Sequence, residues 1–270
     1  MKAVRLLAWV VLVAVMGASF GVEFLTKANY ATQFRDELPN ASPTKAHVLG
    51  TDDLGRDRFV RVLYGTRVSL LLAPAAALLS TLLAALIGGF AGYLGGRWEK
   101  LAMASTDLFL SLPWLFLLLM VRAMLPLNVS PITSVMVTFL LLGVLGWAAS
   151  ARVLCAGAKS IRNSDFVLLA KASGVGRARL LIRHVMPNLK PVLLAQFWIS
   201  IPVFILSEAN LGILGLGVAE PLPSWGSLLR ELESFTNFSG EYWKLVPLVL
   251  LVVTVTSFQM ILSRNNEVTA

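Results

Sequence analysis

Few side chains in this sequence have the type and spacing that chemistry requires. The run Gly157-Ala158-Lys159-Ser160 ends as a phosphate-binding loop does, but it lacks the earlier glycine of the Gly-x-x-x-x-Gly-Lys-Ser/Thr pattern. His47 and His184 stand alone, and no His/Cys cluster has the spacing of a metal site. No nucleophile stands beside a recognisable base. We therefore expect no catalytic site, no cofactor and no metal in this chain.

Two single groups stand out within apolar stretches. Cys155 is the only cysteine, so it cannot form an intrachain disulfide, and we expect a small core residue. Glu208 stands where a charge costs at least ~2.5 kcal/mol in membrane-insertion measurements, so it should face protein or a water-filled path. It either lines a pathway or makes a structural hydrogen bond to a neighbouring helix, and we favour the second interpretation.

The composition requires a lipid environment. Of the 270 residues, 57% are apolar and only 14% are charged, and the mean hydropathy is +0.75. Soluble domains carry roughly 25% charged residues. The net charge of +8 would suit nucleic acid, but the basic residues lie in loops between apolar stretches, as membrane topology demands. We therefore expect a membrane protein with no nucleic-acid partner.

Six apolar stretches approach the ~20 residues that a helix needs to cross a bilayer. They cover residues 6–22, 68–94, 108–127, 132–151, 191–215 and 245–263. The sequence therefore predicts an all-α membrane protein with about six transmembrane helices. Its predicted parts are a first helix with an extracytoplasmic segment (1–67), a core of five helices (68–263) and a short cytoplasmic tail (264–270).

Loop charges predict the orientation of these helices. Residues 152–190 carry eight lysines and arginines against one acid, Asp165, which marks this loop as cytoplasmic. Residues 23–67 are nearly balanced and residues 216–244 are more acidic than basic, so both fit the outside. An even number of helices then places both termini in the cytoplasm. The basic N-terminus also suits a signal peptide, but no convincing cleavage site follows it, and we expect an uncleaved helix.

Local patterns predict further details of the helices. Apolar residues at helical spacing, with arginines between them, indicate a short amphipathic helix along the membrane surface over 59–67. Arg122 is expected to extend toward the outer interface, and Pro113 is expected to kink a helix. The glycines between residues 88 and 96 suit close contact between helices.

The basic loop has helical structure of its own. Ser164 can cap a short helix, and Gly174 suits the position just after its end. Gly176 breaks the chain again, and a second short helix over 177–186 is expected to stop at Pro187. Such a helix pair either docks a soluble partner or lies on anionic lipid. The physical arguments weigh equally for both.

This loop resembles a known element. Residues 159–191 are similar to the cytoplasmic "EAA" loop of ABC importer permeases, which has Glu-Ala-Ala, then Gly, then a hydrophobic pair and Pro at fixed spacing. The positions that fit are Ala170, Gly174, Val185, Met186 and Pro187. Leu168 and Leu169 stand where that family has Glu and Ala, so the polar part of the contact differs while the shape of the loop is kept.

Two further stretches resemble the dipeptide and oligopeptide "C" subunits of that family. Residues 49–57 (LGTDDLGRD), followed by 63–70 (LYGTRVSL), are similar to the signature before their second helix. Residues 207–218 (SEANLGILGLGV), with PSWG shortly after, are similar to the end of their fifth helix. Each motif is weak alone, but the ordered set covers residues 49–229. Residues 257–270 lack the family's usual ending.

The resemblance implies a transport role in the inner (plasma) membrane of a prokaryote. The chain would form half of a translocation pathway for peptides, paired with a homologous permease. Two ATPase subunits would bind ATP and Mg, and a substrate-binding protein would deliver cargo outside. The residues implied in coupling to the ATPases are Asp165, Ala170, Gly174, Val185, Met186 and Pro187.

Other functions remain open at this point. A stand-alone secondary transporter or channel would more often show paired discontinuous helices or an internal repeat, and neither is visible. An intramembrane enzyme would need a polar partner for Glu208 at matching depth. Within the same family, the cargo could instead be a nickel chelate, a sugar or another small solute, and export is a less favoured direction.

Overall fold

The computed structural model describes residues 2–26, 28–35, 38–126, 129–234 and 241–262. In these ranges the chain is helical, apart from turns, loops and two isolated bridges, Gln33 with Arg56 and Thr51 with Asp57. Five helices are long and apolar enough to cross a membrane, and a sixth is added if the bent pair α5–α6 counts as one span. The prediction of an all-α membrane protein with about six spans is confirmed.

The chain divides into two compact units. Residues 1–73, 122–139 and 202–270 form the first unit, and residues 74–121 and 140–201 form the second. Three long helices, α3 (Arg58–Ala84), α7 (Pro131–Leu145) and α11 (Met186–Ile213), contribute to both units.

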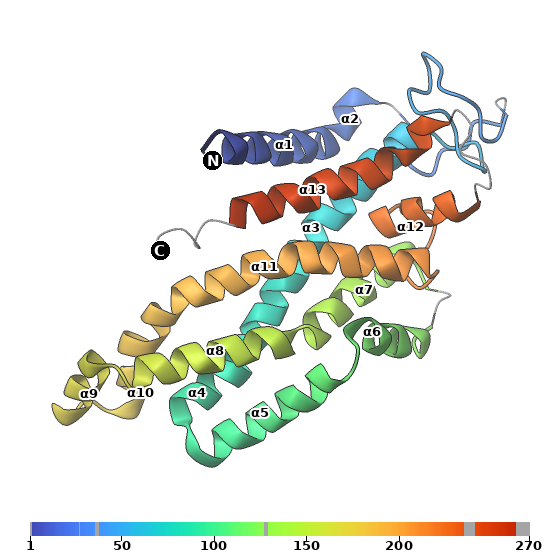
Figure 1. Ribbon diagram of the computed structural model, residues 1–270. Helices are drawn as coiled ribbons and strands as arrows, with labels where there is room; N and C mark the ends of the chain where they lie inside the picture. Colours follow the sequence, from blue (N-terminus) through green and yellow to red (C-terminus); the bar gives the residue numbers. More distant parts are fainter. Residues whose placement is uncertain (1, 27, 36–37, 127–128, 235–240, 263–270) are drawn as a thin grey trace. The chain divides into compact units, whose positions relative to one another are not determined.

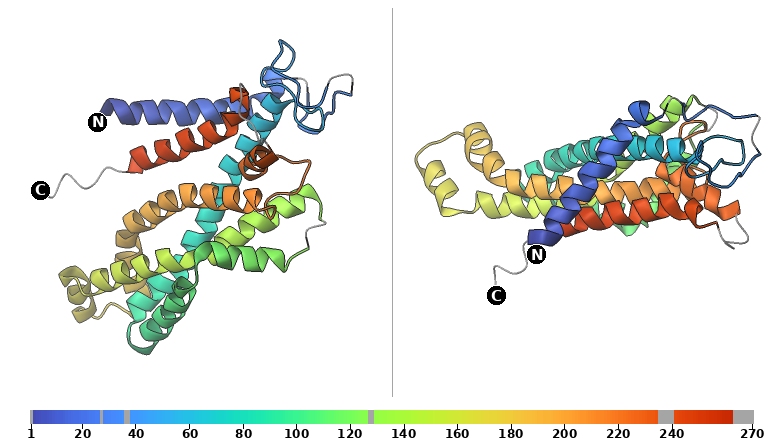
Figure 2. Two further views of the ribbon diagram at one scale, coloured as in Figure 1. Left: turned by 45° about the vertical axis from the view of Figure 1, so that its right-hand side comes forward. Right: turned by 90° about the horizontal axis from the view of Figure 1, so that it is seen from above.

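The first unit gathers helices from both ends of the chain. Besides its parts of α3, α7 and α11, it contains α1 (Lys2–Phe20), α2 (Val22–Leu25), α12 (Trp225–Arg230), α13 (Val246–Leu262) and the 3₁₀ turns Glu231–Ser234 and Tyr242–Leu245. Helix α1 packs beside α13, and this contact is visible in both Figure 1 and Figure 2. The first and last helices therefore share one unit.

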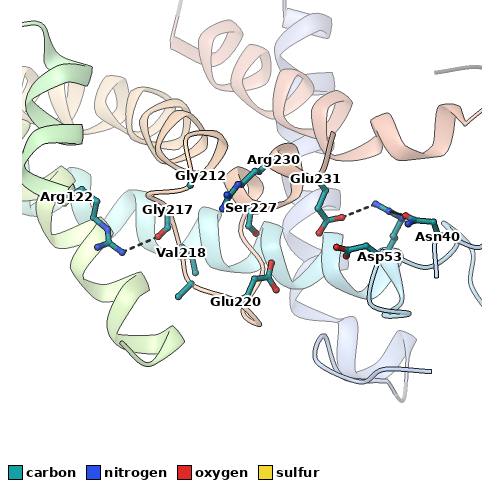
Figure 3. A pocket seen from close by; sticks show the side chains of 13 residues that line it. Asn40, Asp53, Arg122, Gly212, Gly217, Val218, Glu220, Ser227, Arg230 and Glu231 are labelled. Carbon is teal, nitrogen blue, oxygen red and sulfur yellow. Dashed lines mark hydrogen bonds and ion pairs between the residues drawn. The ribbon is translucent and has the colours of Figure 1, made fainter. Parts of the chain in front are cut away.

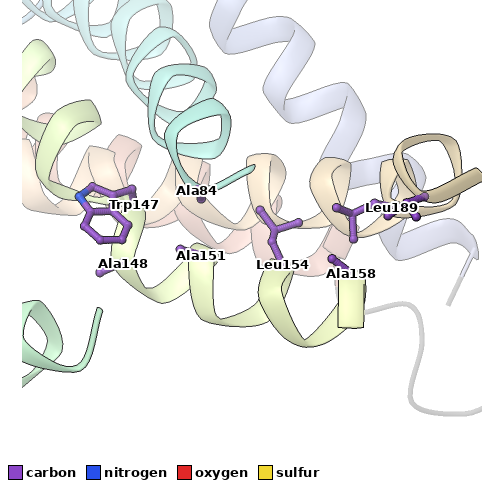
Figure 4. Packing of buried hydrophobic residues seen from close by; sticks show 8 residues of the cluster. Ala84, Trp147, Ala148, Ala151, Leu154, Ala158 and Leu189 are labelled. Atoms are coloured by element: carbon purple, nitrogen blue, oxygen red, sulfur yellow. The ribbon is translucent and has the colours of Figure 1, made fainter. Parts of the chain in front are cut away.

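The second unit centres on α8. It contains the end of α3, the π segment Ala85–Gly89, α4 (Phe90–Leu94), α5 (Gly96–Ser111), most of α6 (Trp114–Ala123), α8 (Trp147–Arg162), α9 (Asp165–Ala172), α10 (Arg177–Leu180), the π segment Leu181–Val185 and the start of α11. Small residues on α8 pack with larger neighbours in one buried cluster (Figure 4). The cluster consists of Ala84, Trp147, Ala148, Ala151, Leu154, Ala158, Val185 and Leu189.

Glycines allow close backbone contact in this unit, as predicted. A Cβ atom at Gly88 would lie 2.0 Å from the carbonyl oxygen of Ala151, and one at Gly92 would lie 2.2 Å from that of Cys155. Both carbonyls belong to α8, so the two backbones touch where any larger residue would separate them. Cys155 is buried, which confirms it as a core residue.

One predicted helix boundary is wrong, and one predicted kink is a complete break. The third apolar stretch was expected to begin a helix near residue 108, but α5 begins at Gly96 and ends at Ser111. Leu112 is extended (ψ 137°) because Pro113 excludes the helical conformation from the preceding residue. Helix α6 then starts at an 83° bend, so Pro113 breaks the helix where only a kink was predicted.

The predicted surface helix over 59–67 is also wrong. These residues are the first turns of α3, which runs without a break from Arg58 to Ala84. Arg58 and Arg61 are buried because acidic side chains meet them inside the fold. The boundary predicted between residues 67 and 68 therefore falls within one helix, and the predicted tail 264–270 lies outside the described residues.

Candidate functional site

The loop between α8 and α11 begins with a helix that ends as predicted. The amide of Val175 donates to the carbonyl of Ala170 at 3.1 Å, and the amide of Gly174 donates to the carbonyl of Lys171 at 3.1 Å. This pair of bonds is a Schellman motif, which requires a left-handed residue after the helix. Gly174 supplies it with φ +82°. Ser164 precedes α9 as expected, but its hydroxyl donates to Ile161 and does not cap α9.

The second half of the loop differs from the prediction. Pro187 was expected to end a separate short helix, but α10 continues through the π segment Leu181–Val185 into α11. Pro187 is the second residue of α11. The wider π turn before it accommodates the missing amide donor, so the helix goes on. The span containing this segment therefore extends over Arg177–Ile213.

Buried contacts hold the loop on the second unit. Val185 is fully buried in the α8 cluster beside Leu189. The Tyr93 hydroxyl donates to the carbonyl of Arg177 at 2.6 Å, and Nη1 of Arg162 donates to the carbonyl of Tyr93 at 3.3 Å. Val185 and Arg177 lie on the segment that continues into α11, so these contacts tie the loop to the start of that helix.

The outer face of the loop is apolar and basic. Of the residues predicted for coupling, Asp165, Gly174, Met186 and Pro187 are exposed, Ala170 is half-buried, and only Val185 lies in the core. Four large apolar side chains of this loop are also exposed: Phe166, Leu168, Leu169 and Ile182. Basic side chains are exposed among them: Lys171, Arg177, Arg179 and Arg183. Such a surface suits a soluble protein partner with acidic and apolar groups.

Glu208 lies in the first unit, fully buried near the end of α11. The hydroxyl of Ser69 on α3 donates to its Oε2 at 3.4 Å. Its Oε1 faces Gly226, where a Cβ would lie 2.9 Å from it. Ser69 also accepts the amide of Trp225 at 3.3 Å. The carboxyl group therefore links α3, α11 and α12, which fits the structural interpretation.

An ion-pair network, which the sequence patterns did not reveal, joins three segments of the first unit. Its basic members are Arg56, Arg58 and Arg61, and its acidic members are Asp52, Glu220 and Glu231. Arg61, with no exposed side-chain surface, contacts Glu231 at 2.9 Å and Glu220 at 3.0 Å. These partners stand about 160 to 170 positions away, so no local pattern could indicate the pairing.

The network shifts two acidic groups in opposite directions. Burial raises the pKa of Glu231 above its usual value, and nearby Arg61 and Arg58 offset this only in part. Burial also acts to raise the pKa of Glu220, but hydrogen bonds and charges from Arg61 and Arg56 outweigh it and lower that pKa. The Glu220 carboxylate is therefore stabilised in its charged form.

Arg122 does not extend toward an interface as predicted. It is 1% exposed, and its Nη2 donates to Ser134 Oγ at 3.1 Å and to the carbonyl of Gly217 at 3.4 Å. Tertiary contacts thus override the tendency of an arginine near a helix end to reach water.

A cavity of about 400 Å³ opens within the first unit (Figure 3). Charged side chains on its wall include Asp53, Arg58, Arg122, Glu220, Arg230 and Glu231. Gly212, Gly215 and Gly217 bring backbone to the same wall. In the part of the chain that the structure describes, no group of three or more His, Cys, Asp or Glu residues could hold a metal ion.

The chain is similar in sequence to known proteins. Residues 84–267 match the model of the family described as binding-protein-dependent transport system inner membrane component. The chain is 31% identical over 256 residues to the oligopeptide transport system permease protein OppC of Bacillus subtilis, covering 93% of this chain and 80% of that one. It is also 31% identical over 223 residues to the dipeptide permease DppC of the same organism, covering 82% and 68%.

A third relative comes from another organism. The OppC protein of Escherichia coli is 34% identical over 216 residues, covering 80% of this chain and 69% of that one. The family match includes the whole loop from α9 to α11 and the helices that anchor it. The chain therefore belongs to the family of binding-protein-dependent transport system inner membrane components, the multi-pass permeases of ATP-binding-cassette importers.

Proposed function

We propose that this chain forms half of the translocation pathway of an ATP-driven importer of short peptides. The family match supports the transport role, and the relatives that are named oligopeptide and dipeptide permeases support the cargo. The observation that carries the coupling part of the proposal is the anchored loop with an exposed face. Its base is packed through Val185, while its apolar and basic side chains remain uncovered.

In this proposal, two ATPase subunits supply the energy. They bind ATP and Mg in the cytoplasm and dock on the face that carries Leu169 and Ile182. Closure of the ATPase pair pushes on the loop, and the continuous helix from Arg177 through α11 passes the displacement on. The loop thus acts as a lever on a helix bundle with two arrangements. The chain itself catalyses no reaction.

The remaining partners complete the pathway. A homologous permease supplies the other half, and a substrate-binding protein delivers peptide to the outer face. The protein resides in the inner membrane, with both termini in the cytoplasm, because the most basic loop lies on that side. Residues 23–57 and the segment after α11 then lie outside.

Affinity purification of the chain from its native membrane, with bound proteins identified by mass spectrometry, tests this function. We expect one or two ATPase subunits and a second permease. Leu169→Asp should remove the ATPases, because a charge replaces an exposed apolar contact (69% exposed), and should leave the second permease bound. Leu54→Asp, an equally drastic change at an exposed leucine outside the loop, is the control. Recovery of the chain alone, in a detergent that preserves known complexes, would contradict the proposal.

A further inference from the structure

The cavity of the first unit has more charge on its wall than its ion pairs neutralise. Arg58 pairs with Glu231 at 2.9 Å, and Glu220 pairs with Arg56 at 2.7 Å and with Arg61 at 3.0 Å. The three acids and three arginines of this network balance each other. The charges left on the wall are those of Arg122, Arg230 and Asp53.

Arg122 is the most deeply buried of these three charged residues. It is almost completely buried, and its Nε and Nη1 have no hydrogen-bond partner among the residues that the structure describes. The two bonds of its Nη2 go to uncharged oxygens, those of Ser134 and Gly217. A buried charge without a counter-charge is costly, so an anion beside this group is strongly favoured.

Arg230 adds a second, accessible cation to the wall. Its guanidinium lies against Gly215, where a Cβ would lie 3.1 Å from the central carbon, and its side chain is exposed. No acidic group within the described ranges forms an ion pair with it. Figure 3 shows Arg122 at one end of the cavity and Asp53 and Glu231 at the other, with Arg230 between them and Glu220 below.

The wall therefore carries unpaired charges of both signs. Arg122 and Arg230 are available to a carboxylate, and the exposed carboxylate of Asp53 is available to an ammonium group. The volume of about 400 Å³ lies within the range of pockets that hold small ligands. Gly215 and Gly217 have no side chains, so they leave room for a ligand at this part of the wall.

We propose that this cavity binds a short peptide by its two charged ends, with the carboxylate toward Arg122 and Arg230 and the ammonium group toward Asp53. This inference rests on the proposed peptide transport, and it adds a site in the permease chain itself. The same anionic chemistry is offered by a lipid headgroup, which lacks the paired ammonium and amide of a dipeptide. The unpaired charges of both signs on the wall favour the peptide.

The test measures binding of dialanine to the purified permease–ATPase complex in phosphatidylcholine nanodiscs, without binding protein or ATP. N-acetyl-dialanine and dialanine amide serve as ligands with one end blocked. We expect dialanine to bind and each blocked form to bind about tenfold more weakly or worse, the loss typical of one charge-assisted contact. Titration calorimetry gives the three affinities.

Variants assign each end of the ligand. Arg230→Gln should weaken dialanine binding about tenfold and leave the amide form unchanged, since that form has no carboxylate to lose. Asp53→Asn should do the same for the ammonium end, with the acetylated form unchanged. Arg67→Gln is the matched control, because Arg67 pairs with Glu23 at 2.8 Å and does not line the cavity.

Three results would overturn the inference. They are no dialanine binding by the wild-type complex, equal binding of all three ligands, and loss of dialanine binding when phosphatidylglycerol is added to the discs, which would identify a lipid headgroup as the occupant. If dialanine does not bind but the ATPase subunits are still recovered, the proposed function stands and only the cavity assignment is wrong. Failure to recover those partners contradicts the function whatever the cavity binds.

Discussion

Arg61 on α3 and Glu231 after α12 meet at 2.9 Å, although 170 positions separate them in the sequence. The arginine side chain has no exposed surface, and it also contacts Asp52 at 3.3 Å and Glu220 at 3.0 Å. One buried cation therefore connects the segment before α3, the segment after α11 and the turn after α12. This arrangement makes the three segments dependent on one another.

Removing the central cation should destabilise the first unit strongly. Arg61→Met leaves three acidic groups without their shared partner, and breaking a buried pair on one side costs about 3–5 kcal/mol. Thermal melting in nanodiscs measures the effect, and Glu231→Gln in the same chain should recover part of the loss. Arg67→Met, which breaks the partly exposed pair with Glu23, should cost less than about 1 kcal/mol. Equal losses in both variants would contradict a central role for Arg61.

The network should also give the two glutamates opposite pH dependence. Glu220 has a pKa lowered below its usual 4.5, so its contribution to stability is present above that pH and is lost as the pH falls through the lowered value. The stability difference between wild type and Glu220→Gln should therefore shrink on acidification. Glu231 has a pKa raised above 4.5, so its native state binds protons more readily and its contribution falls as the pH rises. Melting temperatures of both Gln variants, each compared with wild type from about pH 7 to about pH 3, should show opposite trends. Parallel trends would refute the assignment.

Because α8 and the π segment before α4 are in close backbone contact, we predict that two neighbouring glycines of that segment differ in how well they tolerate alanine. Gly88→Ala places a methyl group where the Ala151 oxygen lies 2.0 Å away, and overpacking of this kind costs about 1–3 kcal/mol. Gly89→Ala meets only the end of the Leu189 side chain at 3.6 Å, an ordinary contact. The first variant should melt at a clearly lower temperature and the second should melt like wild type. Indistinguishable melting would show that the second unit packs differently.

The turn between α9 and α10 also contains two glycines that should respond differently to alanine. Gly174 has φ +82°, a conformation that costs an alanine roughly 1–2 kcal/mol, so Gly174→Ala should distort the end of α9. Gly176→Ala is the control, because Gly176 has φ −64° and open space around it. We expect reduced ATP-driven peptide uptake into vesicles for the first variant only, with normal membrane insertion of both. Full uptake by Gly174→Ala would show that transport does not depend on the shape of this turn.

The interpretation of Glu208 as a structural residue is tested by an uncharged substitute. A Gln side chain keeps an oxygen that accepts from Ser69, so Glu208→Gln should preserve assembly and most of the transport. Glu208→Leu removes the acceptor and should lower the melting temperature, with a cost of about 1–3 kcal/mol for the unpaired hydroxyl. A severe loss of transport in the Gln variant, with assembly intact, would instead assign Glu208 to the pathway.

Features that depend on neighbouring residues were predictable from the sequence. The thickness of a bilayer imposes a length on apolar stretches, so the number of spans follows from a one-dimensional pattern. The left-handed turn at Gly174 is local as well, since the five residues around it make the bonds that require it. Pro187 was misjudged because a proline normally ends a helix, and the π turn that accommodates it leaves no sequence signal.

The buried charges were decided by tertiary structure alone. Local rules place Arg61 on a membrane surface and Arg122 at an interface, because they cannot show which distant groups compensate burial. In the folded chain, Glu231 and Gly217 reach these arginines from positions 170 and 95 residues away. The free energy of burying a charge depends on which distant group arrives beside it, and only the packed structure determines that.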